Sequence, residues 1–270
     1  MEIRKNDLIT VEIESLTYGG RGLGRLEGLA VFVPMTMPGD VVQAVVRRKK
    51  SGYIEAELAE VISPSPARVQ PRCPHFGICG GCSWQHVPYE EQLRQKEAIV
   101  RSTLEHVGGI EGFQCRPVIA SPRQWRYRNK VDYTFGTDPG GKAILGFHLP
   151  GSYQDILNIE TCLIQPEPFD GLLDEMRRFA RKHDLSSHNP KTHRGLLRHF
   201  LIRWAEKPGV DGTQPILAAL VTSGPDLPRR DELLARLRER CPSLAGFIHG
   251  VNRAMSDVFR IEQTCFSWGA

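Results

Sequence analysis

The sequence predicts a small all-β barrel followed by an α+β domain with an antiparallel or mixed sheet. Its 270 residues suffice for about two domains of ordinary size. Before the linker at 63–66 the chain shows short strand patterns and glycine-rich turns, whereas strand and helix patterns are mixed after it. We therefore place the barrel at residues 1–64 and the α+β domain at residues 65–270.

The barrel is predicted from a series of short strand patterns. Val11 and Ile13 alternate with two glutamates, as expected of a strand with one buried face. Several short strands without any helix pattern favour a closed barrel over a sandwich. The further strand patterns cover residues 29–33, 41–46 and 53–62, and a basic turn at 47–52 joins the last two.

The α+β domain is predicted from alternating helix and strand patterns. A helix is expected over residues 88–107, because apolar residues recur on one face and two glycines follow it. Further helices are expected at 169–183 and 231–240. Strands are expected at 126–136, 143–149, 155–159, 199–205, 216–222 and 244–251.

Composition and charge exclude several classes of protein. With 40% hydrophobic and 24% charged residues, the chain is not expected to be disordered. No apolar run approaches the ~18 residues of a membrane span, and the N-terminus carries charges where a signal peptide is apolar. We expect a cytosolic protein with no membrane partner.

The basic residues are unevenly distributed along the chain. Residues 65–130 hold ten Lys and Arg against five Asp and Glu, whereas residues 1–64 hold eight against nine. Residues 131–270 are balanced, with seventeen of each sign. A local cationic excess favours binding of a polyanion such as nucleic acid. The alternative interpretation is a solvent-exposed face with no binding role.

Three of the seven cysteines lie close together in a glycine-rich loop at 71–86. Cys73, Cys79 and Cys82 follow a C-x5-C-x2-C spacing, and disulfides are not expected in the cytosol. With Cys162 as the fourth ligand they suit an iron–sulfur cluster, whereas with His86 they suit zinc. Spacing alone leaves both open, and a third interpretation is reduced, buried thiols.

The same residues resemble a known family, the bacterial RNA 5-methyluridine methyltransferases, most closely the branch that modifies 23S ribosomal RNA. Residues 7–62 resemble a TRAM domain, an OB-like RNA-binding barrel, through the stretch 16–22 and the stretch 31–34. The loop with Cys73, Cys79 and Cys82 resembles the cluster-binding segment of the family, and its fourth cysteine falls on Cys162. The resemblance therefore implies a [4Fe–4S] cluster rather than zinc.

The resemblance also implies a methyl donor, S-adenosylmethionine. The sequence departs from the family pattern in one respect. In the family a Rossmann-like methyltransferase domain holds that cofactor and the catalytic cysteine. The chain stops at residues 265–270, about where that domain begins, and its sequence shows no strand followed by a glycine-rich turn and a helix. We predict that the domain is absent and assign no catalytic residue, since Cys115, Cys241 and Cys265 lack an activating setting.

The leading hypothesis is the RNA-recognition portion of a 23S rRNA uracil-C5 methyltransferase, ending before the catalytic domain. The alternatives are a stand-alone RNA-binding iron–sulfur or zinc protein without catalysis, and a zinc-stabilised interaction module. We expect a monomer whose partner is RNA, 23S rRNA in particular. The predicted RNA-binding residues are Arg47, Lys49 and Lys50 on the barrel and Arg126, Arg128 and Lys130 beyond the cysteine loop.

Overall fold

The computed structural model describes residues 3–205, 214–255 and 258–269. The chain divides into two compact units, Met1–Pro122 and Arg123–Ala270. The first unit includes the cysteine loop and the helix that follows it, in addition to the barrel strands.

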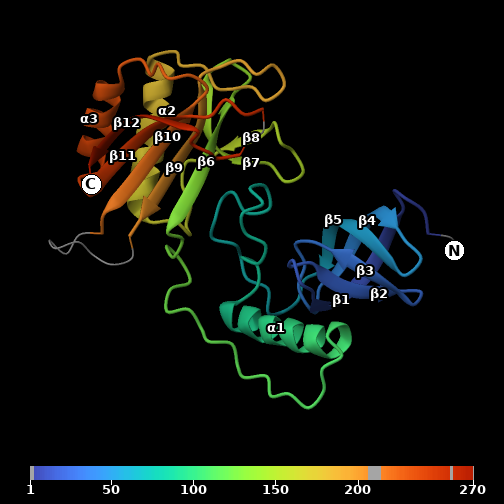
Figure 1. The fold of residues 1–270 in the computed structure, drawn as a ribbon. Helices are drawn as coiled ribbons and strands as arrows, with labels where there is room; N and C mark the ends of the chain where they lie inside the picture. The colour runs from blue at the N-terminus through green and yellow to red at the C-terminus, as the bar shows by residue number, and fades with distance from the viewer. Residues whose placement is uncertain (1–2, 206–213, 256–257, 270) are drawn as a thin grey trace. The chain divides into compact units, whose positions relative to one another are not determined.

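The first unit contains a closed five-stranded barrel (Figure 1). Neighbouring strands follow the order β1-β2-β3-β5-β4, and every pair is antiparallel except the parallel pair of β3 with β5. Closure of the sheet removes its exposed edges, which lets so short a segment be stable. The strands are β1 (Leu8–Leu16), β2 (Gly22–Leu26), β3 (Leu29–Val33), β4 (Val41–Lys49) and β5 (Tyr53–Ser63).

The barrel core is filled by aliphatic side chains from alternate positions of each strand. Val31, Val42 and Ile54 are fully buried, while their neighbours along the strands face outward. Burying each such side chain contributes about 1.5–3 kcal/mol. The alternation in the sequence therefore corresponds to the inner and outer surfaces of the barrel.

Strand β4 extends further than the sequence pattern predicts. The predicted strand ended at residue 46, but a bulge after Val46 keeps Arg48 paired with Glu55 and Lys49 paired with Ile54. A bulge places an extra residue on one strand and increases its twist. The first half of the predicted basic turn is therefore strand, and the hairpin closes over residues 50–52.

Helix α1 (Tyr89–Ser102) packs against the barrel within the first unit. A small apolar cluster joins Leu16 of β1 to Met37 and Val87, with Trp84 and Ile99 partly buried beside it. The helix is shorter than the predicted span 88–107, because its last turn widens into a π-helical segment, η1 (Thr103–Val107).

The buried carboxylate of Asp40 orders the start of the loop that leaves the barrel. It accepts hydrogen bonds from the backbone amides of Met37 and Ser65 and pairs with Arg68. Arg68 also donates to the Met35 carbonyl, 3.2 Å away. One buried ion pair therefore connects the β3–β4 turn to the residues after β5.

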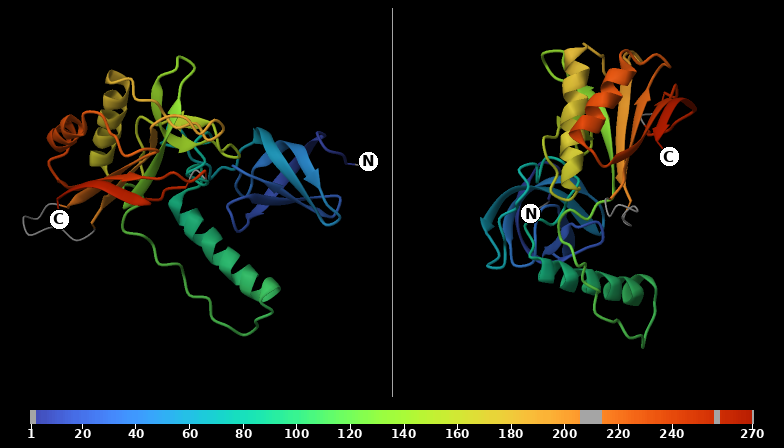
Figure 2. Two further views of the ribbon diagram at one scale, coloured as in Figure 1. Left: turned by 45° about the horizontal axis from the view of Figure 1, so that its top comes forward. Right: turned by 90° about the vertical axis from the view of Figure 1, so that its left-hand side faces the viewer.

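The second unit is a seven-stranded sheet with its helices on one face (Figure 2). The strand order is β12-β11-β10-β9-β6-β7-β8, and only β10 and β11 are parallel. The strands are β6 (Lys130–Thr137), β7 (Ala143–His148), β8 (Ile156–Asn158), β9 (Leu197–Trp204), β10 (Ile216–Thr222), β11 (Leu244–Val251) and β12 (Gln263–Gly269), and the helices are α2 (Glu167–Lys182) and α3 (Arg230–Arg240).

The second unit contains one strand–helix–strand element with parallel strands. Strand β10 leads through a turn with Gly224 into α3, and β11 returns parallel to β10. This turn holds a single glycine, so it is not a glycine-rich turn of the dinucleotide-binding type. Among the described residues, no helix is long and apolar enough to cross a membrane.

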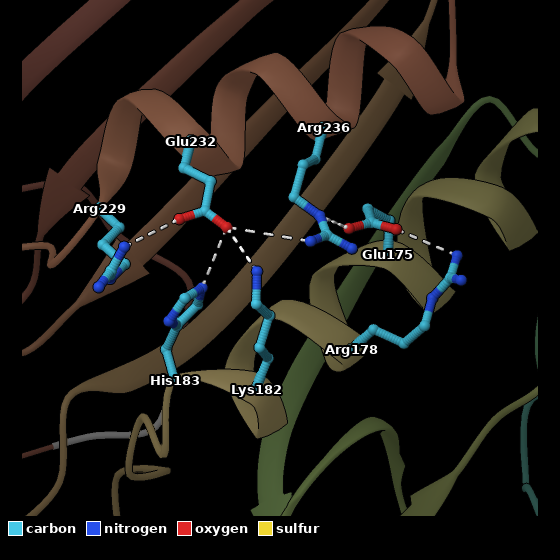
Figure 3. Close-up of polar contacts among 7 residues, drawn as sticks. All are labelled: Glu175, Arg178, Lys182, His183, Arg229, Glu232 and Arg236. Atoms are coloured by element: carbon cyan, nitrogen blue, oxygen red, sulfur yellow. Dashed lines mark hydrogen bonds and ion pairs between the residues drawn. The ribbon is translucent and has the colours of Figure 1, made fainter.

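Helices α2 and α3 are joined by an ion-pair network (Figure 3). Glu232 of α3 accepts from Lys182 at 2.9 Å and from His183 at 3.3 Å. Glu175 of α2 is buried and pairs with Arg236 of α3, and with Arg178 at 3.0 Å. The network fixes the two helices against each other on the same face of the sheet.

Candidate nucleic-acid interface

The β4–β5 hairpin presents basic side chains to solvent. Arg48, Lys49 and Lys50 are exposed, and over the ranges that the structure describes none of them has a carboxylate partner. Arg47 differs, because its Nε lies 2.6 Å from a carboxylate oxygen of Glu57. Three unpaired cations at the end of a strand pair can therefore attract phosphates without first breaking an ion pair.

Arg126 has a different environment from the hairpin cations. Its backbone is left-handed, with φ of 58°, so the strand predicted at 126–136 begins only at Lys130. One guanidinium nitrogen donates to the carbonyls of Cys162 and Gln165, both at 2.9 Å. This guanidinium therefore supports the fold around Cys162.

Asp170 completes the turn that carries Cys162. Its carboxylate accepts from the Cys162 amide at 3.1 Å, the Thr161 hydroxyl at 3.0 Å and the Gln165 side chain at 2.6 Å. Burial raises the pKa of Tyr133 well above its ordinary value, and the nearby Cys162 and Asp170 raise it further. Cys162 therefore lies in a hydrogen-bonded turn between β8 and α2, near Tyr133.

Lys130 and Arg203 form a second cationic pair, on the sheet. They lie directly opposite each other on β6 and β9, and both are exposed. In the described part of the chain neither has a carboxylate partner. Like charges directly opposite each other on paired strands repel. The sequence interpretation missed Arg203, which the register of two predicted strands could have indicated.

The predicted RNA-binding residue Arg128 precedes β6. Its backbone amide donates to the Ile164 carbonyl at 2.8 Å.

The cysteine loop of the first unit is ordered by hydrogen bonds to its backbone. The Cys73 amide donates to the Gln85 side chain at 3.1 Å, and the Cys79 amide to the His75 carbonyl at 2.9 Å. Gly77 and Gly80 have positive φ, as a tight loop around a centre requires.

The predicted ligand set is divided between the two units. Cys73, Cys79 and Cys82 belong to the first unit and Cys162 to the second. In the residues described here no group of three or more His, Cys, Asp or Glu is placed to hold a metal ion. Thiolates are the donors that an iron–sulfur cluster requires.

His86 was the alternative zinc ligand. Its ring is almost fully buried, 5.6 Å from the ring of Phe76, and burial lowers the pKa of the imidazole. His86 is therefore neutral at pH 7 and contributes to packing of the loop. Of the other three cysteines, Cys241 is buried, and Cys115 and Cys265 are partly exposed.

The first unit combines a closed five-stranded barrel with an exposed cationic hairpin. The TRAM domain family matches residues 4–59, which span the barrel. Over its whole length the chain is similar to proteins described as uncharacterized RNA methyltransferases. One from Halalkalibacterium halodurans is 34% identical, with 99% of this chain and 57% of the relative covered. One from Caldanaerobacter subterraneus is 36% identical, with 96% and 57% covered.

A solved structure shares the fold. The tRNA (uracil-54, C5)-methyltransferase of Pyrococcus abyssi, in complex with S-adenosyl-L-homocysteine, matches with a TM-score of 0.66 and 24% identity. The match covers 97% of this chain and 55% of that one. Together these similarities relate the chain to RNA methyltransferases, and the chain spans just over half the length of the relatives that it matches.

Two predictions from the sequence are wrong. The Rossmann-like methyltransferase domain was predicted to be absent, and the chain was predicted to be a recognition portion or a stand-alone binding protein without catalysis. The fold of the solved structure above matches 97% of this chain, and proteins described as RNA methyltransferases match up to 99% of it. The predictions treated the last residue as the end of the protein, and the chain spans only part of its relatives.

Proposed function

We propose that the protein methylates RNA at C5 of a uracil, with S-adenosylmethionine as the methyl donor. The observation that carries this proposal is the similarity to RNA methyltransferases over 99% of the chain. The TRAM match supports RNA as the partner, and the shared fold with a tRNA (uracil-54, C5)-methyltransferase supports the reaction. The protein would act in the cytosol as a monomer.

In this proposal the basic side chains position the RNA. Lys49 and Lys50 on the hairpin, and Lys130 with Arg203 on the sheet, would neutralise backbone phosphates. Phosphate contacts place an RNA without reading its sequence, so they do not select the target uridine. The family resemblance favours 23S rRNA as the target, and tRNA is the alternative because the solved relative acts on tRNA.

The reaction is tested with RNA that lacks the modification. The natural gene product is incubated with methyl-labelled S-adenosylmethionine and total RNA from cells without the gene, and nucleosides are analysed by mass spectrometry. We expect labelled 5-methyluridine in 23S rRNA. Label found only in tRNA would show that tRNA, and not 23S rRNA, is the target. The absence of labelled 5-methyluridine from every RNA would reject the proposal.

One hollow of the second unit, of about 540 Å³, is lined mainly by charged side chains, among them Glu160, Asp174 and Arg177. An adenine ring requires apolar walls, so this hollow does not fit the cofactor. We therefore assign no cofactor-binding residue and no catalytic residue.

We further propose that Cys73, Cys79, Cys82 and Cys162 ligate a [4Fe–4S] cluster. Support comes from the residue types, the spacing and the positive φ of Gly77 in the loop. Protein purified without oxygen should be brown and lose iron in the variant Cys162→Ser but not in His86→Ala. Colourless protein with one bound zinc, or iron loss only in His86→Ala, would reject this ligand set.

A further inference from the structure

We infer that the outer surface of β3 and β5 is a stacking platform for the bases of single-stranded RNA, formed by Phe32 and Tyr53. This inference rests on the proposed RNA-binding function and adds to it a site for unpaired bases. Neither residue was among the predicted RNA-binding residues, which are all basic.

The two rings are brought together by strand register. Val31 of β3 and Ile54 of β5 point into the barrel. Phe32 and Tyr53 are their neighbours along the two strands, so they point outward. The parallel pairing sets Ala30 beside Tyr53, and the ring centroids of Phe32 and Tyr53 lie 5.8 Å apart at 74°. Both rings are half-buried, which holds them in place while part of each stays accessible.

An arginine completes the platform. The guanidinium of Arg21 lies over the Phe32 ring, 6.0 Å from its centroid, and 3.2 Å from a carboxylate oxygen of Glu55. Glu55 pairs with Phe32 in register and therefore lies on the same outer surface. A guanidinium held over a ring offers a flat cationic surface next to the aromatic one.

The charge around the platform suits a polyanion. Arg48 lies opposite Glu55, and the Lys50 amide bonds to the Tyr53 carbonyl at 2.8 Å, so the unpaired hairpin cations border the rings. Five cations lie on this part of the barrel, against two carboxylates that are both paired with arginines. They are Arg21, Arg47, Arg48, Lys49 and Lys50, with Glu55 and Glu57 as the carboxylates.

Rings next to cations favour unpaired RNA over a duplex. A base in a duplex is covered on both faces, whereas an unpaired base offers a free face to an aromatic ring. Stacking on a side chain and phosphate attraction then act on the same strand from neighbouring residues. A polyanion without bases would use only the cations, which separates the two contributions experimentally.

Photocrosslinking tests the contact directly. The natural gene product is mixed with a single-stranded oligouridine carrying 5-iodouridine, which crosslinks to aromatic rings that stack on it, and irradiated. We expect crosslinked peptides that contain Phe32 or Tyr53. Crosslinks confined to other peptides would overturn the inference, and this test requires no variant to fold.

Ring removal tests the energetic contribution. We expect Phe32→Ala and Tyr53→Ala each to weaken binding of single-stranded oligouridine by about 5-fold to 100-fold, the range for one stacked base. The slope of affinity against salt should not change, because no charge is removed. Phe32→Tyr and Tyr53→Phe keep a ring and should bind like the wild type.

The control is Tyr153→Ala, which removes a tyrosine ring that is 65% exposed in the second unit. It should bind like the wild type. If the wild type binds oligouridine but ring removal has no effect in folded variants, the stacking inference fails and the proposed function stands. If the wild type binds no RNA at all, the proposed function fails first.

Discussion

The two basic segments named from the sequence have opposite environments in the structure. At the β4–β5 hairpin, Lys49 and Lys50 are exposed and, within the described residues, have no carboxylate partner. In the segment before β6, Arg126 donates to two carbonyls and faces the carboxylate of Asp170 at 3.4 Å. The hairpin lysines remain available to a ligand, whereas Arg126, the first cation of the other segment, is bonded within the protein.

The difference shows why a cationic excess along the chain does not identify a binding surface. Residues 65–130 have the largest excess of positive charge, yet Arg68 and Arg126 in that segment both support buried or half-buried aspartates. Residues 1–64 have a slight negative excess but contain the exposed hairpin. The number of partners that each cation has, rather than the net charge, distinguishes the two roles.

Loss of the Asp170 carboxylate is expected to have the largest effect. The variant Asp170→Ala leaves the Cys162 amide, the Gln165 side chain and Arg126 without their shared acceptor. We expect the second unit to lose about 3 kcal/mol of unfolding free energy, measured by urea denaturation. Asp226→Asn, at an exposed position, is the control, and equal stability of the two variants would contradict the structural role.

Arg126→Ala should have the next largest effect. It removes the donor to the carbonyls of Cys162 and Gln165, and because the side chain is about one-third exposed we expect a loss of about 2 kcal/mol. RNA affinity of the folded variant should keep the salt dependence of the wild type. A flatter salt dependence without loss of stability would place Arg126 among the RNA contacts and remove the contrast between the two segments.

Individual strands could be predicted where one face is buried and the other is solvated. The alternation from Tyr53 onward marks β5, and the apolar run at Leu29 marks β3. The ends of elements could not be predicted in the same way. Arg48 and Lys49 have no apolar pattern, and they are strand only because a bulge keeps them paired with β5. Arg126 leaves the strand pattern because its side chain bonds to residues 162 and 165, far along the chain.

The candidate site could be predicted in its charge but not in its aromatic part. The run of basic residues at 47–50 is visible in the sequence, and the structure leaves Lys49 and Lys50 exposed. Phe32 and Tyr53 are twenty-one positions apart, and only the parallel pairing of β3 with β5 joins them. Strand patterns along the chain do not indicate which non-consecutive strands pair, so this pair of rings could not be predicted from them.

The exposed hairpin cations should affect binding and not stability. We expect the double variant Lys49→Ala, Lys50→Ala to bind single-stranded RNA about tenfold more weakly and to lower the salt slope by about 1.4, or 0.7 for each phosphate contact. The unfolding free energy should stay within about 0.5 kcal/mol of the wild type. Titrations at several salt concentrations measure the slope, and an unchanged slope would exclude Lys49 and Lys50 from the RNA contacts.

The smallest effect is expected at the network between α2 and α3, where every charge is used within the protein (Figure 3). The hydrogen bond from Lys182, aided by His183, lowers the pKa of Glu232 to about 2. A lowered carboxyl pKa stabilises the fold above pH ~4.5, where the unfolded group is ionised, and this stabilisation is lost as the pH falls toward 2. Glu232→Gln should therefore be less stable than the wild type at pH 6 and equally stable near pH 2, as measured by thermal unfolding. A difference that stays constant with pH would show that Glu232 acts through packing rather than through its charge.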